Sequence, residues 1–348
     1  MKKSVEYKKK RRKRYKGTHP KKFSEKYKEH NPEKYPADVA KVIQSGKTPA
    51  GSHRPVLVTE VLEILDPQPG QTGLDATLGY GGHARQLLDR IQPGGRLFAL
   101  DVDPIEVVRT EERLREAGFT EEQLVIRRMN FAGMPKILME AGGGFDFILA
   151  DLGVSSMQLD NPERGFSFKH EGPLDLRLNP SRGQTAAALL KTLSVEELEN
   201  ILWANADERF GNALSKAIFE KRKEIQTTTD LADVIRKALA ARPRPPEEDE
   251  VTKSIQRTFQ ALRVEVNDEF SALEQFMRIL PCGMKSGAKA ALLTFHSGED
   301  KRVMRSFLEG LENGTYSSIS RDPVKPGPQE CYDNPRARSA YLRWAIRA

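Results

Sequence analysis

Apolar residues recur along the chain with a period that changes from segment to segment. From Val56 to Leu65 they fall at helical spacing, and Pro67 to Gly70 ends that helix. Short apolar runs then alternate with amphipathic helical patterns. We expect strands near 72–77, 96–101, 124–128 and 145–151, and helices near 82–91, 104–117 and 133–141. Alternating strands and helices predict an α/β fold with a doubly wound, mostly parallel sheet, whose ligands bind beyond the carboxyl ends of the strands.

The alternation stops after Asp151. A loop-rich stretch leads to about Arg182, and helical patterns follow at 184–204, 211–224 and 228–241. A Pro-rich acidic linker, Arg242–Glu250, then precedes the last part of the chain. There we expect a long helix at 251–280, a buried strand at 287–295, a helix near 299–311, and strands near 315–320 and 338–346. The pattern therefore predicts an all-α domain inserted into the sheet domain.

These patterns divide the chain into four parts. We expect a disordered basic tail at 1–52, the first part of the sheet domain at 53–158, an inserted helical domain at 159–250, and the second part of the sheet domain at 251–348. The formal net charge of +7 is concentrated in the tail, because residues 1–36 hold 15 Lys and Arg against 4 Asp and Glu, or +11. The remaining 41 basic and 45 acidic residues give −4. The body is therefore not a uniformly basic nucleic-acid binder.

The tail itself allows two interpretations. It is either a solvated solubility tail or an arm that binds a polyanion, since lysines neutralise phosphates and its interleaved aromatic residues can stack on bases. We favour the arm, because a run of like charges seldom folds alone.

Several classes of protein are disfavoured. No apolar run approaches the about 18 residues of a membrane helix, and charge stands where a signal peptide has its apolar stretch, so we expect a cytoplasmic protein with no membrane partner. Cys282 and Cys331 belong to no CxxC pair, so we expect reduced thiols and no metal.

The strongest local motif is Asp75-Ala-Thr-Leu-Gly79-Tyr-Gly81-Gly82-His83, which places glycines where a buried strand turns into a helix. Glycine lets a ligand approach the backbone closely. The same spacing fits a dinucleotide fingerprint, so it does not choose between NAD and S-adenosylmethionine. Asp101 ends the next strand, about 20 residues on, where its carboxylate can accept both ribose hydroxyls of either ligand. Asp103, before Pro104, is the better candidate for the cap of the following helix.

A further carboxylate favours the sulfonium cofactor, and another ends a strand at the same edge. Asp75, just before the glycines, can meet the cationic amino-acid end of S-adenosylmethionine, whereas it would repel a pyrophosphate. Asp151 ends the fourth strand at the same edge of the sheet. We therefore expect the glycine loop, Asp101 and Asp151 to converge on one pocket.

Segments along most of the chain resemble one known family. They are Asp75 to His83, Asp151-Leu-Gly-Val-Ser-Ser156, Glu163-Arg-Gly-Phe-Ser-Phe168, Gly172-Pro-Leu-Asp-Leu-Arg177, Arg257-Thr-Phe-Gln-Ala-Leu-Arg263, Phe295-His-Ser297 and Asn334-Pro-Arg-Ala-Arg-Ser339. In this order they resemble the MraW/RsmH family of ribosomal RNA methyltransferases over about residues 53–346. The resemblance implies a class I S-adenosylmethionine-dependent methyltransferase fold (Rossmann-like) with an inserted all-α substrate domain. It also implies N4-methylation of a cytidine in the decoding region of 16S ribosomal RNA, with the small ribosomal subunit as partner.

The resemblance also implies the cofactor contacts. They fall on Gly81, Gly82, His83, Asp101, Phe131, Asp151 and Gln158, with Phe131 against the adenine. The sequence departs from the family pattern at Asn179, where Asp is usual, at Gly298, where Leu is usual, and in the long basic tail. None of these departures touches the expected cofactor contacts.

The chemistry leaves alternatives open. The lone pair of a cytosine amine is delocalised into the ring, so catalysis should consist mainly of aligning the nitrogen with the methyl group and accepting hydrogen bonds from the amine. Asp151 could accept such a bond in addition to contacting the cofactor. His296 either faces the pocket or has no role in catalysis, because a capping box of Ser297 with Asp300 would explain this segment by itself. Four arginines are either RNA contacts or ion-pair partners: Arg164, Arg177, Arg257 and Arg263.

Two other functions remain as alternatives to methyl transfer. A nicotinamide-dependent oxidoreductase would fit the glycines but not Asp75 or the helical insertion. A non-catalytic RNA-binding ribosome-assembly factor would use the tail and the insertion, with the sheet as scaffold only.

Overall fold

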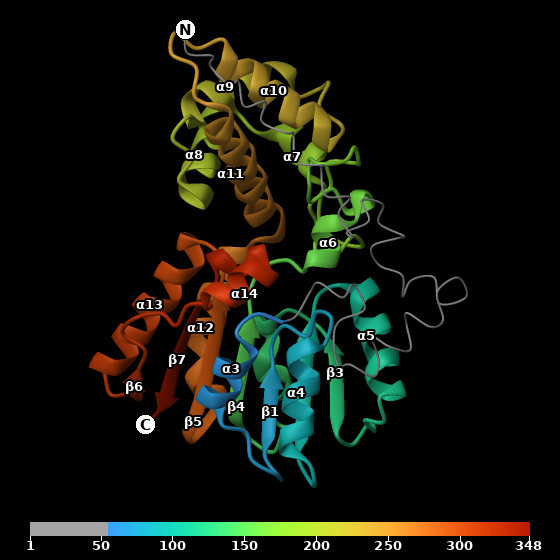
Figure 1. Cartoon of the computed structure of the whole chain (residues 1–348), viewed down its shortest axis with the longest axis vertical. Helices are drawn as coiled ribbons and strands as arrows, with labels where there is room; N and C mark the ends of the chain where they lie inside the picture. The colour runs from blue at the N-terminus through green and yellow to red at the C-terminus, as the bar shows by residue number, and fades with distance from the viewer. Residues whose placement is uncertain (1–54) are drawn as a thin grey trace, which may run out of the picture. The chain divides into compact units, whose positions relative to one another are not determined.

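The strands form one seven-stranded sheet in the order β3-β2-β1-β4-β5-β7-β6 (Figure 1). Neighbours among the first five strands are parallel, and β7 runs antiparallel to both β5 and β6. The bounds are β1 Thr72–Asp75, β2 Arg96–Asp101, β3 Leu124–Arg128, β4 Phe145–Asp151, β5 Met284–Thr294, β6 Tyr316–Ile319 and β7 Tyr341–Arg347. The predicted mostly parallel sheet is confirmed.

The computed structural model describes residues 55–348, which lie in one unit, Ser52–Ala348. The predictions for the tail at 1–52 fall outside the described residues. Within the described residues, every helix is too short or too polar to cross a membrane.

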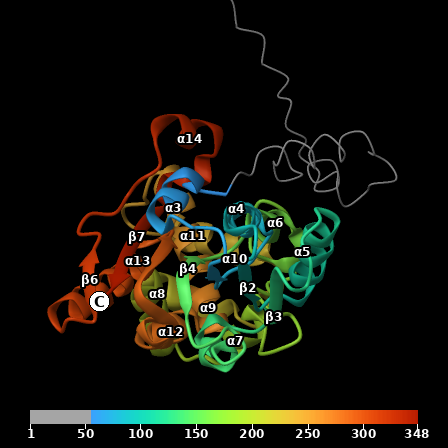
Figure 2. The same cartoon turned by 90° about the horizontal axis from the view of Figure 1, so that it is seen from below.

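Helices cover both faces of the sheet, which explains why its central strands are apolar on both sides. One face packs against α3 (Val58–Leu65), α4 (Gly82–Ile91) and α5 (Pro104–Glu116). The other packs against the 3₁₀ helix η2 (Phe131–Ile137), α12 (Glu269–Gly283) and α13 (Ser297–Glu312). Figure 2 shows α3 and α4 on the opposite side of the strands from α12.

Five of the helices between β4 and β5 share a separate apolar core, and Figure 1 shows them grouped together. These are α7 (Ala186–Thr192), α8 (Val195–Ala206), α9 (Gly211–Lys221), α10 (Thr228–Ala240) and α11 (Glu248–Asn267). We call them the helical cluster. The predicted division of the chain into domains stays a prediction. The side chains of Val251 and Leu262 pack in this core, which supports moving the predicted boundary at residue 250 to the end of α11.

Short elements connect the helical cluster and the last strands. The helix α6 (Ser156–Asp160) and the 3₁₀ helix η3 (Pro162–Arg164) follow β4, and α14 (Pro328–Asp333) and η4 (Pro335–Ser339) precede β7.

Three predicted helices differ from those observed. The helix expected at 133–141 is the 3₁₀ helix η2, with Pro135 inside it, because proline has no N–H for a helical bond. The pattern at 184–204 is two helices, since the Ser194 side chain caps α8 in a capping box with Glu197. The pattern at 251–280 is also two helices, which meet at Asp268, a residue in the left-handed conformation (φ 49°).

Candidate functional site

The loop after β1 is shaped by glycines with positive φ. Gly79 (φ 48°) donates its N–H to Asp101 Oδ2 at 2.7 Å, and Gly81 (φ 78°) is the N-cap residue of α4. A Cβ atom built on Gly79 meets only the carbonyl oxygen of Thr77 within 4 Å, at 3.8 Å, so the space beyond this loop is open. The Thr110 hydroxyl holds the loop from α5 by donating to the Gly79 carbonyl at 2.7 Å. The motif therefore forms a fixed backbone turn that a ligand can approach.

Asp101 lies at the end of β2 beside the glycine loop, as the sequence predicted. Its Oδ1 accepts the N–H of Asp103 at 2.8 Å, and its Oδ2 accepts that of Gly79. Burial raises the pKa of this carboxyl, and the two backbone bonds oppose the shift. Each carboxylate oxygen has a further lone pair, which can accept a ligand hydroxyl.

Asp75 and Asp151 end the adjacent strands β1 and β4. Burial raises the pKa of Asp75 to about 7, and the negative charge of Asp101 adds to the effect. Burial likewise raises the pKa of Asp151 to about 7, reinforced by the charges of Asp75 and Glu299. The Asp151 N–H donates to the Thr77 hydroxyl at 2.6 Å, but its Oδ1 is buried without a hydrogen-bond partner among the described residues. A buried orphan oxygen of this kind marks a place for a polar ligand group.

His83 stands behind Asp151 at the start of α4. It is buried, and its Nε2 lies 3.8 Å from Asp151 Oδ2. Burial lowers the pKa of His83 to about 4, against a hydrogen bond to the Val56 backbone, so the ring is neutral at pH 7. Its Nε2 has no hydrogen-bond partner within residues 55–348. The structure thus brings together His83 and Asp151, two residues to which the family resemblance assigns cofactor contacts.

Phe131 and Gln158 are the two remaining residues that the resemblance assigns to the cofactor. Phe131 begins η2 after β3, is half-buried, and packs edge-on against Phe276 with ring centroids 5.1 Å apart. Gln158 is buried, its Oε1 accepts the N–H of Ser155 at 2.8 Å, and its Nε2 donates to Asp103 Oδ2 at 2.8 Å. Both polar ends of Gln158 are therefore engaged within the protein.

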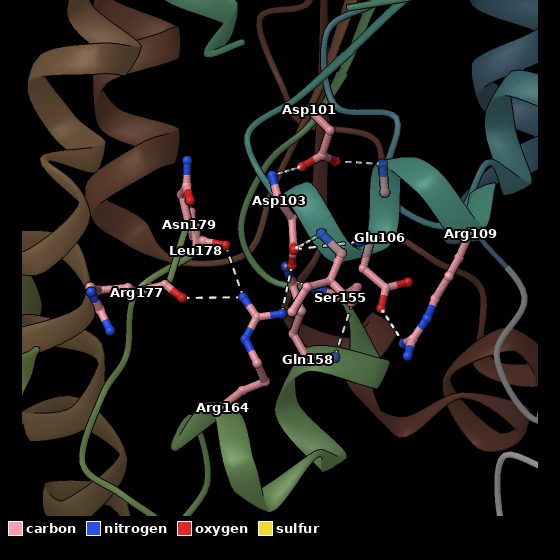
Figure 3. Close-up of polar contacts among 12 residues, drawn as sticks. Asp101, Asp103, Glu106, Arg109, Ser155, Gln158, Arg164, Arg177, Leu178 and Asn179 are labelled. Carbon is pink, nitrogen blue, oxygen red and sulfur yellow. Dashed lines mark hydrogen bonds and ion pairs between the residues drawn. The ribbon is translucent and has the colours of Figure 1, made fainter. Parts of the chain in front are cut away.

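The prediction that Asp103 caps α5 is confirmed, since its Oδ1 accepts the N–H of Ile105 at 2.9 Å. The sequence did not reveal its second role: Oδ2 also binds Arg164 Nη1 at 2.7 Å (Figure 3). Each of the four candidate RNA-binding arginines has a carboxylate partner, which favours the ion-pair alternative. The pairs are Arg164–Asp103, Arg177–Asp175, Arg257–Glu208 and Arg263–Glu269.

The predicted capping box of Ser297 with Asp300 is wrong. His296 is the N-cap of α13, with its ring accepting the N–H of Glu299 at 3.4 Å, because Ser297 is already the first residue of the helix. The Asp300 carboxylate instead binds Arg343 through both oxygens. His296 Nε2 lies 3.2 Å from Glu299 Oε1, and Glu269 stands close enough that the three side chains could share an ion. Arg263 already pairs with Glu269, however, and we propose no ion there.

Thr77 and Thr110 are the residues that sequence reasoning missed. Their hydroxyls hold the Asp151 backbone and the glycine loop, respectively. Thr77 stands inside the Asp75–His83 motif, so its position was visible in the sequence. Its partner, 74 residues further on, was not.

The protein is a class I S-adenosylmethionine-dependent methyltransferase. This class is defined by the strand order with an antiparallel β7, together with the glycine loop after β1 and the carboxylate that ends β2. The chain belongs to the MraW methylase family, whose family model matches residues 50–348.

Similar curated proteins span nearly the whole chain. Ribosomal RNA small subunit methyltransferase H 1 of Lachnoclostridium phytofermentans is 54% identical over 342 residues, which cover 97% of this chain and 93% of that protein. Ribosomal RNA small subunit methyltransferase H 2 of Alkaliphilus metalliredigens is 55% identical over 346 residues, with 99% of each chain covered. The matched length therefore spans both the sheet and the helical cluster.

Proposed function

We propose that this protein methylates N4 of a cytidine in the decoding region of 16S ribosomal RNA. The observation that carries the proposal is the buried, unpartnered Oδ1 of Asp151 beside the glycine loop and Asp101. Membership of the methylase family, and the names of its relatives, support ribosomal RNA as the substrate. The small ribosomal subunit is then the partner and the bacterial cytoplasm the location.

The residues around this pocket fit S-adenosylmethionine. We propose that Asp101 accepts the ribose hydroxyls and that the backbone of Gly81 and Gly82 lies along the cofactor. Asp75 would meet the ammonium group, and Phe131 would lie against the adenine. His83, Asp151 and Gln158 complete the proposed set, although the internal bonds of Gln158 favour an indirect role. When bound, the cofactor supplies an electrophilic methyl group.

Asp151 is the proposed proton acceptor. Transfer of a methyl group from the cofactor's sulfur would leave the amine nitrogen positively charged, with a proton to lose. Asp151 Oδ1 is free to accept a hydrogen bond from the amine and then that proton. A pKa of about 7 suits a group that takes up and releases a proton near neutral pH. We expect Asp151→Asn to lower kcat about 100-fold or more, and unchanged turnover would remove this role.

The helical cluster is the proposed RNA-holding part. It adjoins the pocket through the segment after β4, and its core is independent of the two sheet cores. Because all four candidate arginines are paired with carboxylates, RNA contact is left to other side chains of the cluster.

The decisive experiment uses small ribosomal subunits from a strain that lacks this gene. Purified protein is incubated with them and labelled S-adenosylmethionine, and the modified nucleosides are mapped by mass spectrometry. We expect N4-methylcytidine in the decoding region, with none formed by Asp101→Ala. Asp146→Asn is the matched control, because Asp146 pairs with Lys285 on the same sheet outside the pocket.

The other outcomes are informative. Cofactor binding without transfer would point to another RNA or assembly stage. If the protein neither binds S-adenosylmethionine nor transfers a methyl group, the non-catalytic assembly factor would be favoured. The oxidoreductase alternative is wrong, because the family is a methylase family.

A further inference from the structure

The Asp103 carboxylate is a buried junction between the sheet and the chain that enters the helical cluster (Figure 3). Its side chain is 0% exposed. Oδ1 caps α5, and Oδ2 accepts two side-chain bonds, from Gln158 Nε2 at 2.8 Å and from Arg164 Nη1 at 2.7 Å. These partners lie 55 and 61 residues further along the chain. The cap of α5 therefore also anchors α6 and η3.

Arg164 extends this junction toward the helical cluster. Its Nη2 donates to the carbonyl oxygens of Leu178 at 2.8 Å and Arg177 at 3.2 Å. The N–H of Leu178 in turn donates to Asn267 Oδ1 at 2.7 Å, and Asn267 is the last residue of α11. The segment that enters the cluster and the helix that leaves it are thus tied at one place.

The junction also reaches the proposed cofactor pocket. The backbone N–H of Asp103 donates to Asp101 Oδ1, the carboxylate proposed for the ribose. A continuous series of bonds therefore runs from Asp101 through Asp103 and Arg164 to the end of α11.

Backbone contacts fix where Arg164 stands. Gly165, the next residue, has φ 70°, and a Cβ atom on it would lie 2.0 Å from the Pro173 carbonyl oxygen. A Cβ atom on Gly172 would lie 2.0 Å from the Pro162 carbonyl oxygen. These two glycines allow η3 to lie directly against the segment before α7, so Arg164 has little freedom to move.

We propose that Arg164 is a positioning residue, which acts through Asp103 to hold the helical cluster in register with the strand-end pocket. This inference rests on the proposed function, in which the cluster holds the RNA. Methyl transfer needs the amine aligned with the methyl group, and a misplacement of about 1 Å can cost about 100-fold in rate. The structure assigns Gln158 to the same junction, so its effect on the cofactor is indirect.

The test is Arg164→Lys, with Arg343→Lys as the matched control. Lysine keeps the charge beside Asp103 but loses the planar fork that reaches the carbonyls of Arg177 and Leu178. Arg343 is buried to a similar degree, pairs with Asp300 and also binds a carbonyl oxygen, that of Arg321. Its contacts join β7 to α13 and involve no residue of the helical cluster.

The first measurement is the distance between spin labels on the sheet part and on the helical cluster, made without RNA or cofactor. Labels go on Met139→Cys and Trp203→Cys, both exposed positions, in a Cys282→Ser, Cys331→Ser background. We expect a narrow distance distribution in the parent and in Arg343→Lys, and a broadened or shifted one in Arg164→Lys. An Arg164→Lys distribution that matches the control would overturn the proposal, whatever the enzyme's substrate proves to be.

The second measurement separates positioning from binding. We expect Arg164→Lys to lower kcat by about 10- to 100-fold, while the Kd for S-adenosylmethionine changes by less than about 2-fold and Arg343→Lys keeps the parent kcat. A loss of cofactor affinity as large as the loss of kcat would contradict a positioning role. If Arg164→Lys does not fold, Gln158→Met removes one bond of the junction, and an unchanged label distance in that variant counts against the proposal.

Discussion

At the scale of single residues, Asp75 and Asp151 carry the main electrostatic cost of the site. Burial and neighbouring carboxylates raise the pKa of each to about 7. An unfolded aspartate titrates near 3.9, so between about pH 4 and pH 7 the native protein binds more protons than the unfolded chain. The free energy of unfolding therefore falls as the pH rises through this window and levels off above it.

Asp151→Asn should remove part of this pH dependence. We expect the variant to match the wild type below about pH 4 and to exceed its free energy of unfolding by up to about 4 kcal/mol at pH 8. The Asp151 side chain is 30% exposed, so water reduces the gain below that limit. Urea unfolding at a series of pH values measures it, with Asp146→Asn as the control for losing an aspartate from β4. Parallel curves for Asp151→Asn and wild type would contradict the raised pKa.

Gly298 is a position at which the sequence is expected to depart from the family pattern, and its surroundings in the structure favour a glycine. A Cβ atom there would lie 2.6 Å from Phe270 Cζ and 3.2 Å from His296 Nδ1, so the Phe270 ring occupies the space of a side chain. We expect Gly298→Ala to destabilise the protein by about 1 kcal/mol, although alanine favours helices, because it overpacks this contact. Combining it with Phe270→Leu should recover part of the loss. Thermal unfolding of both single variants and the double variant tests this, and a stabilised Gly298→Ala would exclude the clash.

At the scale of elements, the buried strands were the most predictable part of the fold. The strands at 96–101, 124–128 and 145–151 were predicted with their observed bounds, because apolar runs buried on both faces end abruptly at polar residues. The start of α5 was visible in the Asp103-Pro104 pair. The break at Asp268 was not visible, because an aspartate in the left-handed conformation carries no sequence signal as strong as glycine's.

Strand ends explain why only part of the site could be predicted. Asp75, Asp101 and Asp151 each end a parallel strand, so the topology alone brings them to one edge. The roles of Gln158 and Arg164 depend on contacts with Asp103 across 55 and 61 residues. No local pattern records such contacts.

The break between α11 and α12 makes its own prediction. Asp268 has φ 49°, and its side chain makes no capping bond to α12. Glycine adopts this conformation without the cost of about 1 kcal/mol that other residues incur. We expect Asp268→Gly to raise the free energy of unfolding by up to about 1 kcal/mol, and Asp268→Ala to leave it equal or lower. Chemical denaturation compares the two, and equal stabilisation by alanine would show that the charge of Asp268, rather than its backbone conformation, is unfavourable.

At the scale of the whole molecule, charge is divided between the tail and the rest of the chain. Residues 1–36 carry +11 while the remainder carries −4. The acidic carboxylates around the pocket suit a cationic cofactor and oppose an RNA backbone. We therefore expect attraction to RNA to come mainly from residues 1–36, whose structure lies outside the described part of the chain.

Deleting residues 2–50 should accordingly weaken RNA binding and make it less sensitive to salt. For single-stranded RNA, the slope of log K against log salt becomes shallower by about 0.7 for each phosphate that the protein no longer neutralises. We expect the affinity at low salt to fall by at least about 10-fold, with a shallower slope, while the Kd for S-adenosylmethionine is unchanged. A tail of scrambled sequence keeps the charge and should restore both affinity and slope, because the effect is electrostatic. Full affinity in the deletion would instead show that the tail is a solubility segment and that the acidic body binds RNA through local contacts alone.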